Sequence, residues 1–150
     1  SYVVHLTKVA METMLACAAD PTLRADLAVT CALLHDSIED AGVTDAELTA
    51  SFGAEVAAGV RALTKDKTLA KEQKMADSLR RIQAAPREVR VVKLADRITN
   101  LEPPPEEWTR EKREGYRLEA AEIYAALKGA SAVLEARFLA KLEEYRRHCT

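Results

Sequence analysis

Glycine and proline interrupt this sequence at only a few points, and the runs between them have helical periodicity. The chain has five glycines and five prolines in 150 residues, and three of the prolines form one block at 103–105. Within the runs, apolar residues recur every three or four positions, and no segment shows the alternation typical of a half-buried strand. Both residues disfavour helix interiors, so their scarcity permits long helices. The sequence therefore predicts an all-α fold, a compact bundle of about eight helices.

Capping residues and prolines indicate where these helices begin and end. Asp20 followed by Pro21 is the pattern of an N-cap and a first helical residue, so we expect the second helix to begin there and to reach His35 and Asp36. The segment 44–47, Thr-Asp-Ala-Glu, is a capping box, and the short helix that it opens should end at Phe52-Gly53. The other helices are expected at 2–19, 54–63, 70–84, 88–101, 106–127 and 131–148. The apolar residues expected inward on the first and last helices are Val3, Leu6, Val9, Ala10, Met14, Cys17, Val133, Leu134, Phe138, Leu139 and Leu142.

Size, charge and cysteine content narrow the class of protein. A chain of 150 residues is expected to form one domain, 1–150, and to bury roughly two-thirds of its unfolded surface. A formal net charge of −2 argues against a general nucleic-acid binder. No apolar run is long enough to span a bilayer and no signal peptide is visible, so no membrane partner is expected. The three cysteines have no metal-ligand spacing and suit a reducing cytosol, which favours a cytoplasmic location.

Four side chains with acid/base or metal-binding chemistry follow the apolar end of the second helix. They are His35, Asp36, Glu39 and Asp40. On one continuous helix, His35 and Asp36 would point in neighbouring directions, and the two acids would return above them one turn later. Imidazole beside carboxylate is a ligand pair for a divalent cation, and a further pair of carboxylates could orient and deprotonate a water. This spacing indicates a metal-dependent hydrolytic site.

Two further positions are ambiguous when they are taken singly. Asp96 and Asn100 share a face of the helix expected at 88–101, at the border of its apolar side. A buried Asp96 needs a metal or a partner, and pairing with Lys93 or Arg97 is the simpler interpretation. His5 lies on or beside the apolar stripe of the first helix, where a histidine is usually a packed core residue.

The order of these residues resembles the H…HD…D signature of the HD-domain phosphohydrolases. The finer pattern is similar to RelA/SpoT-type hydrolase domains, and most to their stand-alone form, the small alarmone hydrolases. The resemblance rests on Tyr2-Val-Val-His5, on the segments 33–40, 52–53, 63–67 and 92–101, and on Trp108 and Tyr116. These motifs occur in the family's order over nearly the whole chain, although Leu6 replaces a usual proline.

The resemblance implies an HD-domain helical bundle and an enzyme of the stringent response. Its substrate would be guanosine tetra- or pentaphosphate, and the 3′-pyrophosphate would be removed to give GDP or GTP. One divalent ion, manganese in this family, would be held by His5, His35, Asp36 and Asp96. Glu39 and Asp40 would activate or position the attacking water. Asn100 would contact the ribose or base, and Lys71, Lys112 and Tyr116 stand where family members touch substrate phosphates or ribose.

The residue types agree with a single ion of this kind. Two imidazoles and two carboxylates suit manganese, iron or zinc better than magnesium, which prefers oxygen ligands. A second ion would need further ligands, typically histidines, and the only remaining histidine is His148 near the C-terminus. The lysines that could provide a positive field, or equally a solvated helix face, are Lys65, Lys67, Lys71 and Lys74.

Two alternatives and one departure from the family pattern stay open at this point. The chain could be an HD phosphohydrolase of another nucleotide, such as an NADPH phosphatase, or an inactive module that senses nucleotide. Intact Glu39 and Asp40 speak against the inactive module. An Arg/Lys-Gly segment that grips the nucleotide in the family precedes the Tyr2 motif, so either residues upstream of Ser1 complete the substrate site or substrate binding is compromised. The sequence leaves open whether the protein forms a homo-oligomer.

Overall fold

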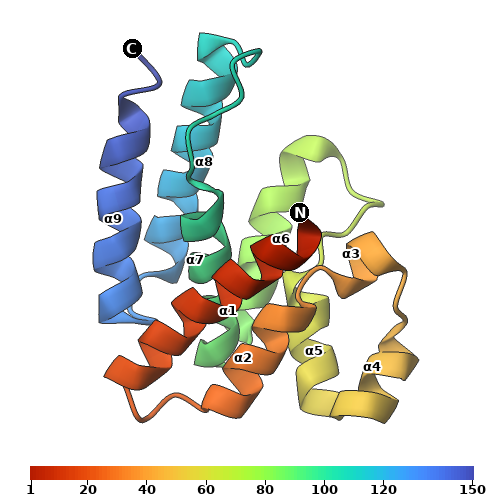
Figure 1. The fold of residues 1–150 in the computed structure, drawn as a ribbon. Coiled ribbons are helices and arrows are strands. Elements are labelled where there is room, and N and C mark those ends of the chain that lie inside the picture. Colours follow the sequence, from red (N-terminus) through yellow and green to blue (C-terminus); the bar gives the residue numbers. More distant parts are fainter.

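The computed structural model describes residues 1–150 and contains nine α-helices and no strands (Figure 1). This confirms the predicted all-α fold; eight helices correspond to expected ones, and the ninth is the single-turn helix α3. The helices are α1 (Tyr2–Ala19), α2 (Ala25–Leu34), α3 (Ser37–Ala41), α4 (Asp45–Phe52), α5 (Ala54–Leu63), α6 (Lys71–Ala84), α7 (Arg87–Asn100), α8 (Arg110–Leu127) and α9 (Ala132–Arg146).

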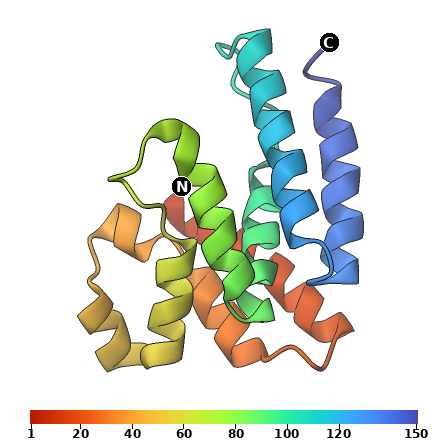
Figure 2. The same ribbon diagram turned by 180° about the vertical axis from the view of Figure 1, so that it is seen from behind.

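Helix α7 is the centre of the bundle. It contacts α1, α2, α5, α6, α8 and α9. In Figure 1, α1 crosses in front of it, α2 lies beside its lower end, the pair α8 and α9 stands to one side, and α4 and α5 lie on the other. The reverse view shows α6 beside α8 (Figure 2). Every other part of the fold is therefore positioned, directly or through one neighbour, by α7.

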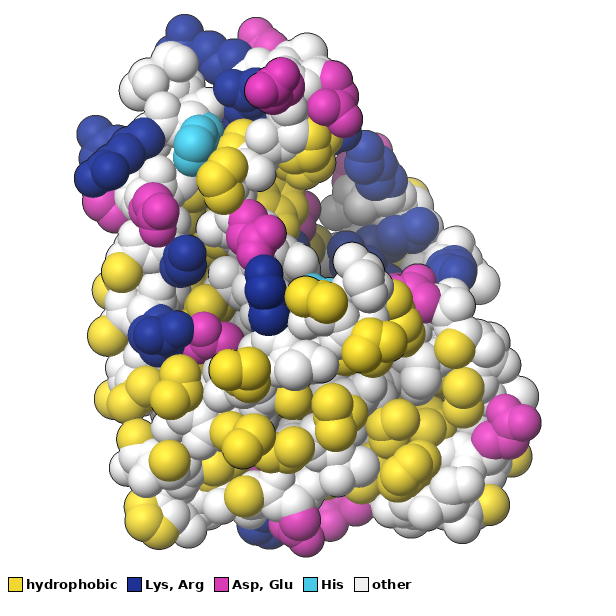
Figure 3. All heavy atoms as spheres, in the orientation of Figure 1, with side chains coloured by type: hydrophobic (Ala, Val, Ile, Leu, Met, Phe, Trp, Pro, Cys, Tyr) yellow, Lys and Arg dark blue, Asp and Glu magenta, His cyan; other side chains and the backbone are white.

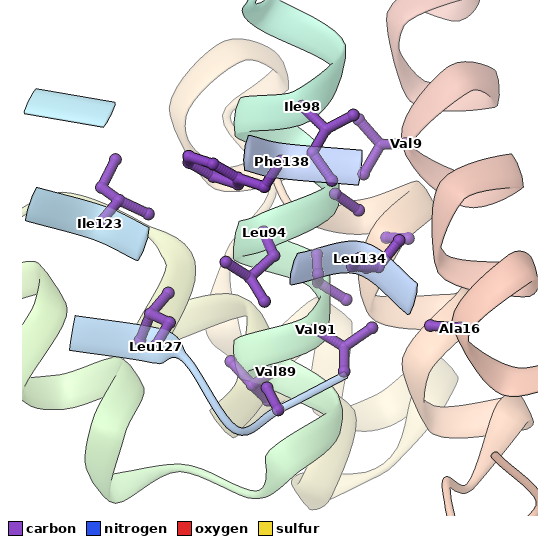
Figure 4. Packing of buried hydrophobic residues seen from close by; sticks show 14 of the residues in the cluster. Val9, Ala16, Val89, Val91, Leu94, Ile98, Ile123, Leu127, Leu134 and Phe138 are labelled. Carbon is purple, nitrogen blue, oxygen red and sulfur yellow. The ribbon is translucent and has the colours of Figure 1, made fainter. Parts of the chain in front are cut away.

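The main hydrophobic core comprises 24 buried residues gathered around α7. Figure 4 shows Val91, Leu94 and Ile98 of α7 meeting Leu134 and Phe138 of α9, with side chains from α1 and α8 closing the two flanks. A second cluster has only three buried residues, Leu48, Ala57 and Val60, and it joins α4 to α5. The inward face predicted for α7 is fully buried, as expected from its apolar spacing.

Two helices begin later than predicted. Asp20 ends α1, and its carboxylate accepts hydrogen bonds from the backbone N–H and the hydroxyl of Thr22, so Pro21 lies in a turn and α2 begins at Ala25. An Asp side chain that binds its own chain two residues on stabilises a turn in place of a helix start. Helix α8 begins at Arg110 because the Thr109 hydroxyl caps it by accepting from the N–H of Lys112. The capping box predicted at 44–47 is confirmed, with both of its reciprocal hydrogen bonds present.

The buried stripe predicted for α1 is partly wrong. Val3 and Met14 are 68% and 54% exposed, whereas Thr13 and Ala16 are fully buried. Thr13 can face the core because its hydroxyl donates to the carbonyl of Val9 one turn earlier. Leu139 of α9 was also predicted to face inward and is 47% exposed. None of the helices combines the length and the apolar composition that a bilayer crossing requires.

Candidate metal centre

The His35-Asp36 doublet lies on a turn between two helices. Helix α2 ends at Leu34, and Asp36 is the N-cap of the next helix, α3, with φ −101° and ψ 3°. The prediction of one continuous helix through the motif is therefore wrong. The break reorients the chain. Helix α3, which carries Glu39 and Asp40, is little more than one turn long, and it ends at Gly42, whose φ is 65°.

A backbone contact orients the His35 ring. Its Nδ1 lies 2.7 Å from the carbonyl oxygen of Ala32. A carbonyl can only accept, so Nδ1 carries a proton and donates, and Nε2 is the atom that faces the other site residues. His35 is 4% exposed, and the ring is therefore held in place by both packing and hydrogen bonding.

Four side chains from three separate parts of the chain converge on one point. His5 comes from α1, His35 and Asp36 from the turn, and Asp96 from α7. The Nε2 atoms of His5 and His35 are 3.4 Å apart, although the residues are 30 positions apart in sequence. Asp96 Oδ1 lies 3.1 Å from His5 Nε2 and 3.3 Å from His35 Nε2. Asp36 Oδ2 lies 3.2 Å from His35 Nε2 and 3.7 Å from His5 Nε2.

These separations fit a shared divalent cation. Bonds of about 2.1 Å at right angles place two ligand atoms about 3.0 Å apart, close to the distances within the cluster. His5, His35 and Asp96 each offer one ligand atom within 4.8 Å of the others, and Asp36 adds a fourth. Mixed imidazole and carboxylate ligands suit a borderline divalent metal. The residues thus form a candidate divalent metal site of the kind expected in an HD domain.

The charges in this cluster are strongly coupled. Burial alone would lower the pKa of His35, but hydrogen bonds with Asp36 and Asp96 outweigh it and raise the pKa to about 10. Burial would raise the pKa of Asp96, but hydrogen bonds with His35 and His5 hold that pKa well below its usual range. The cluster therefore stabilises positive charge at its centre, carried by protons when no metal competes for the nitrogens.

The acidic pair on α3 faces the same cavity as the cluster. The cavity has a volume of about 640 Å³ and is lined by the four candidate ligands together with Glu39 and Asp40. The backbone N–H of Lys65 donates to Glu39 Oε1 at 3.2 Å, which holds one oxygen of that carboxylate toward the loop after α5. Figure 3 shows the surface hollowed between the upright pair α8 and α9 and the lower half of the bundle, with basic side chains along one wall.

Two of the four predicted substrate-binding residues lie in this cavity. Asn100 lines it and donates to Asp96 Oδ1 at 3.2 Å, and Tyr116 lines it from α8. Lys71 and Lys112 are not among its lining residues. The ammonium of Lys112 lies over the Trp108 ring, 4.3 Å from its centroid. A smaller cavity of about 380 Å³ adjoins the first through His5, Asn100 and Tyr116, and its other walls are largely aromatic and proline residues.

Sequence reasoning did not assign Arg97 and Glu119 to the site. Arg97 Nη2 donates to Glu119 Oε1 at 2.6 Å, and the guanidinium lies 4.5 Å from the centroid of the Tyr116 ring. Pairing of Asp96 with Arg97 therefore does not occur, whereas Lys93 Nζ is 3.6 Å from Asp96 Oδ2. The spacing of Lys93 and Arg97, one helical turn apart, could have indicated that both face the cavity. No comparable signal marks Glu119.

Comparison with known proteins agrees with this geometry. The HD domain family matches residues 1–133. Guanosine-3′,5′-bis(diphosphate) 3′-pyrophosphohydrolase MESH1 of Danio rerio is 33% identical over 111 residues, which are 71% of this chain and 62% of that protein. GTP pyrophosphokinase of Myxococcus xanthus is 38% identical over 111 residues, 68% of this chain and 14% of that protein.

A solved structure extends the likeness to the fold. It is described as a metazoan ortholog of SpoT that hydrolyses ppGpp and plays a role in starvation responses. The match has a TM-score of 0.81 at 26% identity and covers 99% of this chain and 83% of that one. The matched residues thus extend over nearly the whole chain in structure, and over about 62% of the length of the Danio rerio relative in sequence.

Proposed function

This chain belongs to the HD domain family and is related to MESH1-type ppGpp hydrolases and RelA/SpoT hydrolase domains, and we propose that it hydrolyses guanosine tetra- and pentaphosphate. The reaction would add water across the bond between the ribose 3′ oxygen and the adjacent phosphorus. The products would be pyrophosphate and GDP or GTP. The observation that carries the proposal is the convergence of His5, His35, Asp36 and Asp96 beside an acidic pair in one cavity.

One divalent ion, manganese in our proposal, would be held by His5, His35, Asp36 and Asp96. When bound, such a cation lowers the pKa of water and offsets the negative charge of phosphate oxygens. His35 presents Nε2 to it because Nδ1 is engaged by the Ala32 carbonyl. Asn100, which donates to Asp96 Oδ1, helps to hold that carboxylate in its orientation.

Glu39 and Asp40 would supply the general base. Both line the cavity, and neither belongs to the cluster of candidate ligands. A carboxylate within hydrogen-bond reach of the attacking water can take its proton, and this typically contributes about 10²–10⁴-fold to the rate. The hydrogen bond from the Lys65 N–H fixes one oxygen of Glu39 and leaves the other free for the water. The proton would finally reach the departing ribose oxygen.

Asn100 and Tyr116 would meet the nucleoside at the junction of the two cavities. Both residues line the larger cavity and the smaller one, so a ligand whose phosphates reach the cluster would place its ribose between them. The Tyr116 hydroxyl is 3.5 Å from the Asn100 carbonyl, and the two residues therefore form one edge of this junction. Lys71 and Lys112 remain proposed contacts only for phosphates that extend beyond the cavity.

The direct test is to incubate the purified protein with Mn²⁺ and guanosine tetraphosphate. We expect pyrophosphate and GDP in equal amounts, and no product after treatment with a chelator. NADPH should be offered in parallel, with release of inorganic phosphate as the readout. Turnover of NADPH without turnover of guanosine tetraphosphate would contradict the proposed substrate, and turnover of neither would contradict the proposed activity.

A further inference from the structure

Three cationic side chains line the main cavity, and they differ in how far they are already paired. The residues are Lys65, Lys93 and Arg97. The guanidinium of Arg97 is partly paired: Nη2 donates to Glu119 at 2.6 Å and the group lies over the Tyr116 ring, whereas Nε and Nη1 have no hydrogen-bond partner. Lys65 is half-buried. Lys93 is 8% exposed, and its ammonium donates no hydrogen bond to any protein atom.

The carboxylate nearest to Lys93 cannot fully satisfy it. Asp96 Oδ2 is 3.6 Å from Lys93 Nζ, beyond ordinary hydrogen-bond distance. The other oxygen of Asp96 already faces both histidine rings and the Asn100 amide. An ammonium has three donors, and no protein acceptor lies within hydrogen-bond distance of this one where it lines the cavity, so packing alone explains the cation poorly.

A divalent cation bound by the four candidate ligands would add positive charge beside Lys93 and so favour the binding of an anion there. Asp96 would then share its charge with the metal, and the attraction between Asp96 and Lys93 would weaken. The ammonium would remain buried beside a divalent ion, and the shortage of negative charge on this side of the cavity would have to be met by a ligand. A phosphate oxygen has the charge and the acceptor capacity that this position lacks.

We propose that Lys93 binds a phosphate oxygen of the nucleotide beside the metal centre, so that the metal and the ammonium hold the 3′-pyrophosphate from two sides. The inference rests on the proposed function for the identity of the nucleotide. The side chain would act by direct contact with the substrate, and it would contribute to holding pyrophosphate even in the absence of turnover.

The test compares Lys93→Met with Lys128→Met, a matched loss of charge at an exposed position on the C-cap of α8. Inorganic pyrophosphate is the probe, and its affinity for the manganese-loaded protein is measured by calorimetry. A lost charge-assisted hydrogen bond should weaken binding about ten- to a hundredfold in Lys93→Met. The Lys128→Met protein should bind as the unaltered protein does. Lys93→Arg should recover part of the affinity, because it restores a cationic donor.

Manganese content and the unfolding temperature of each variant separate binding from a structural role. We expect Lys93→Met to retain one manganese per chain. Unchanged pyrophosphate affinity would overturn the proposal. Loss of the metal together with the affinity would also overturn it, because Lys93 would then act only by supporting Asp96. Pyrophosphate binding needs no hydrolysis, so weakened binding in a protein that fails to cleave guanosine tetraphosphate would contradict the proposed function and leave the role of Lys93 intact.

A measurement on the unaltered protein covers the case in which Lys93→Met does not fold. In protein labelled with ¹³C-lysine, the Lys93 Cε signal is identified by its loss in Lys93→Arg. With diamagnetic Zn²⁺ in place of Mn²⁺, adding pyrophosphate should shift this signal and leave that of Lys128 in place. An unmoved Lys93 signal at saturating pyrophosphate would overturn the proposal.

Discussion

The two faces of α7 are both largely buried but opposite in chemistry. On one face, Val91, Leu94 and Ile98 are at most 2% exposed and pack into the main core. On the other, Lys93 and Arg97 are 8% and 5% exposed, and Nε and Nη1 of Arg97 have no hydrogen-bond partner. Burial of the first face removes apolar surface from water, which stabilises the fold. The second buries charge, which costs free energy unless it is paired.

The difference separates the residues that stabilise the fold from the residues that form the candidate site. Apolar residues on the cavity face would stabilise the fold as well as these charged residues do, or better. Asp96, Lys93 and Arg97 are instead retained beside two histidines, in a cavity large enough for phosphate groups. We infer that the core face determines stability and the cavity face determines metal and substrate binding, and substitutions on each should separate the two properties.

The largest effect is expected from Asp96→Asn on the cavity face. The amide keeps the shape of the side chain but removes the charge that faces His5 and His35, so metal affinity should fall more than about a hundredfold and turnover should be lost. Metal content after dialysis is the readout. Asp26→Asn, an exposed acid in the first turn of α2, is the control and should retain the metal. A variant at Asp96 that binds manganese normally would remove Asp96 from the site.

Glu39→Gln should lower turnover by about 10²–10⁴-fold while metal content and unfolding temperature stay unchanged. The reason is that Glu39 lines the cavity without belonging to the ligand cluster. Glu122→Gln, at an exposed position of α8, is the matched control. A near-normal rate for Glu39→Gln would show that the proton is taken by another group, with Asp40 as the first candidate.

Leu94→Ala probes the core face. Removal of a fully buried leucine should lower the free energy of unfolding by about 2–5 kcal/mol, measured by denaturant titration. The rate per folded molecule should be kept, because Leu94 packs in the main core (Figure 4) and does not line the cavity. Leu118→Ala, where the side chain is 55% exposed, should cost much less. A selective loss of activity in folded Leu94→Ala protein would mean that the two faces are not separable.

The last effect concerns pH and the metal-free protein. Because the folded-state pKa of His35 is raised from 6.5 to about 10, its protonation stabilises the fold fully below about pH 6.5. This contribution is lost as pH rises toward 10, so the unfolding temperature of the metal-free protein should fall over that range. His35→Gln should show a flatter profile. The same coupling predicts that metal uptake releases protons and strengthens as pH rises, and an uptake independent of pH would contradict it.

Local sequence signals were sufficient for much of the fold. The capping box at Thr44 and Glu47 located α4, and the apolar spacing of 88–101 identified the core face of α7. The start of α2 was predicted too early because the Asp20 side chain can equally cap a helix or close a turn, and contacts beyond the segment decide between them. No glycine or proline marks the break at Asp36, so the local sequence did not predict it.

The site was predictable where a family pattern fixed the order of residues, and less so where helices meet. Local spacing already indicated His35 and Asp36, whereas His5 and Asp96 were selected by that order, since no spacing within one helix relates them to the doublet. Arg97 and Glu119 pair across α7 and α8, 22 positions apart, so their contact depends on how the two helices pack. Lys71 and Lys112 carry suitable charge but are not among the residues that line the cavity, and their role as phosphate contacts stays a prediction. Charge alone does not indicate which cavity a surface lysine faces.

Anomalous diffraction from crystals grown with manganese tests the central claim most directly. We predict one peak per chain, surrounded by the ring nitrogens of His5 and His35 and carboxylate oxygens of Asp36 and Asp96 at roughly 2.0–2.4 Å. Glu39 and Asp40 should lie outside that shell. No peak between the four residues would contradict the account, and so would a second bound ion held by Glu39 and Asp40 or by His148.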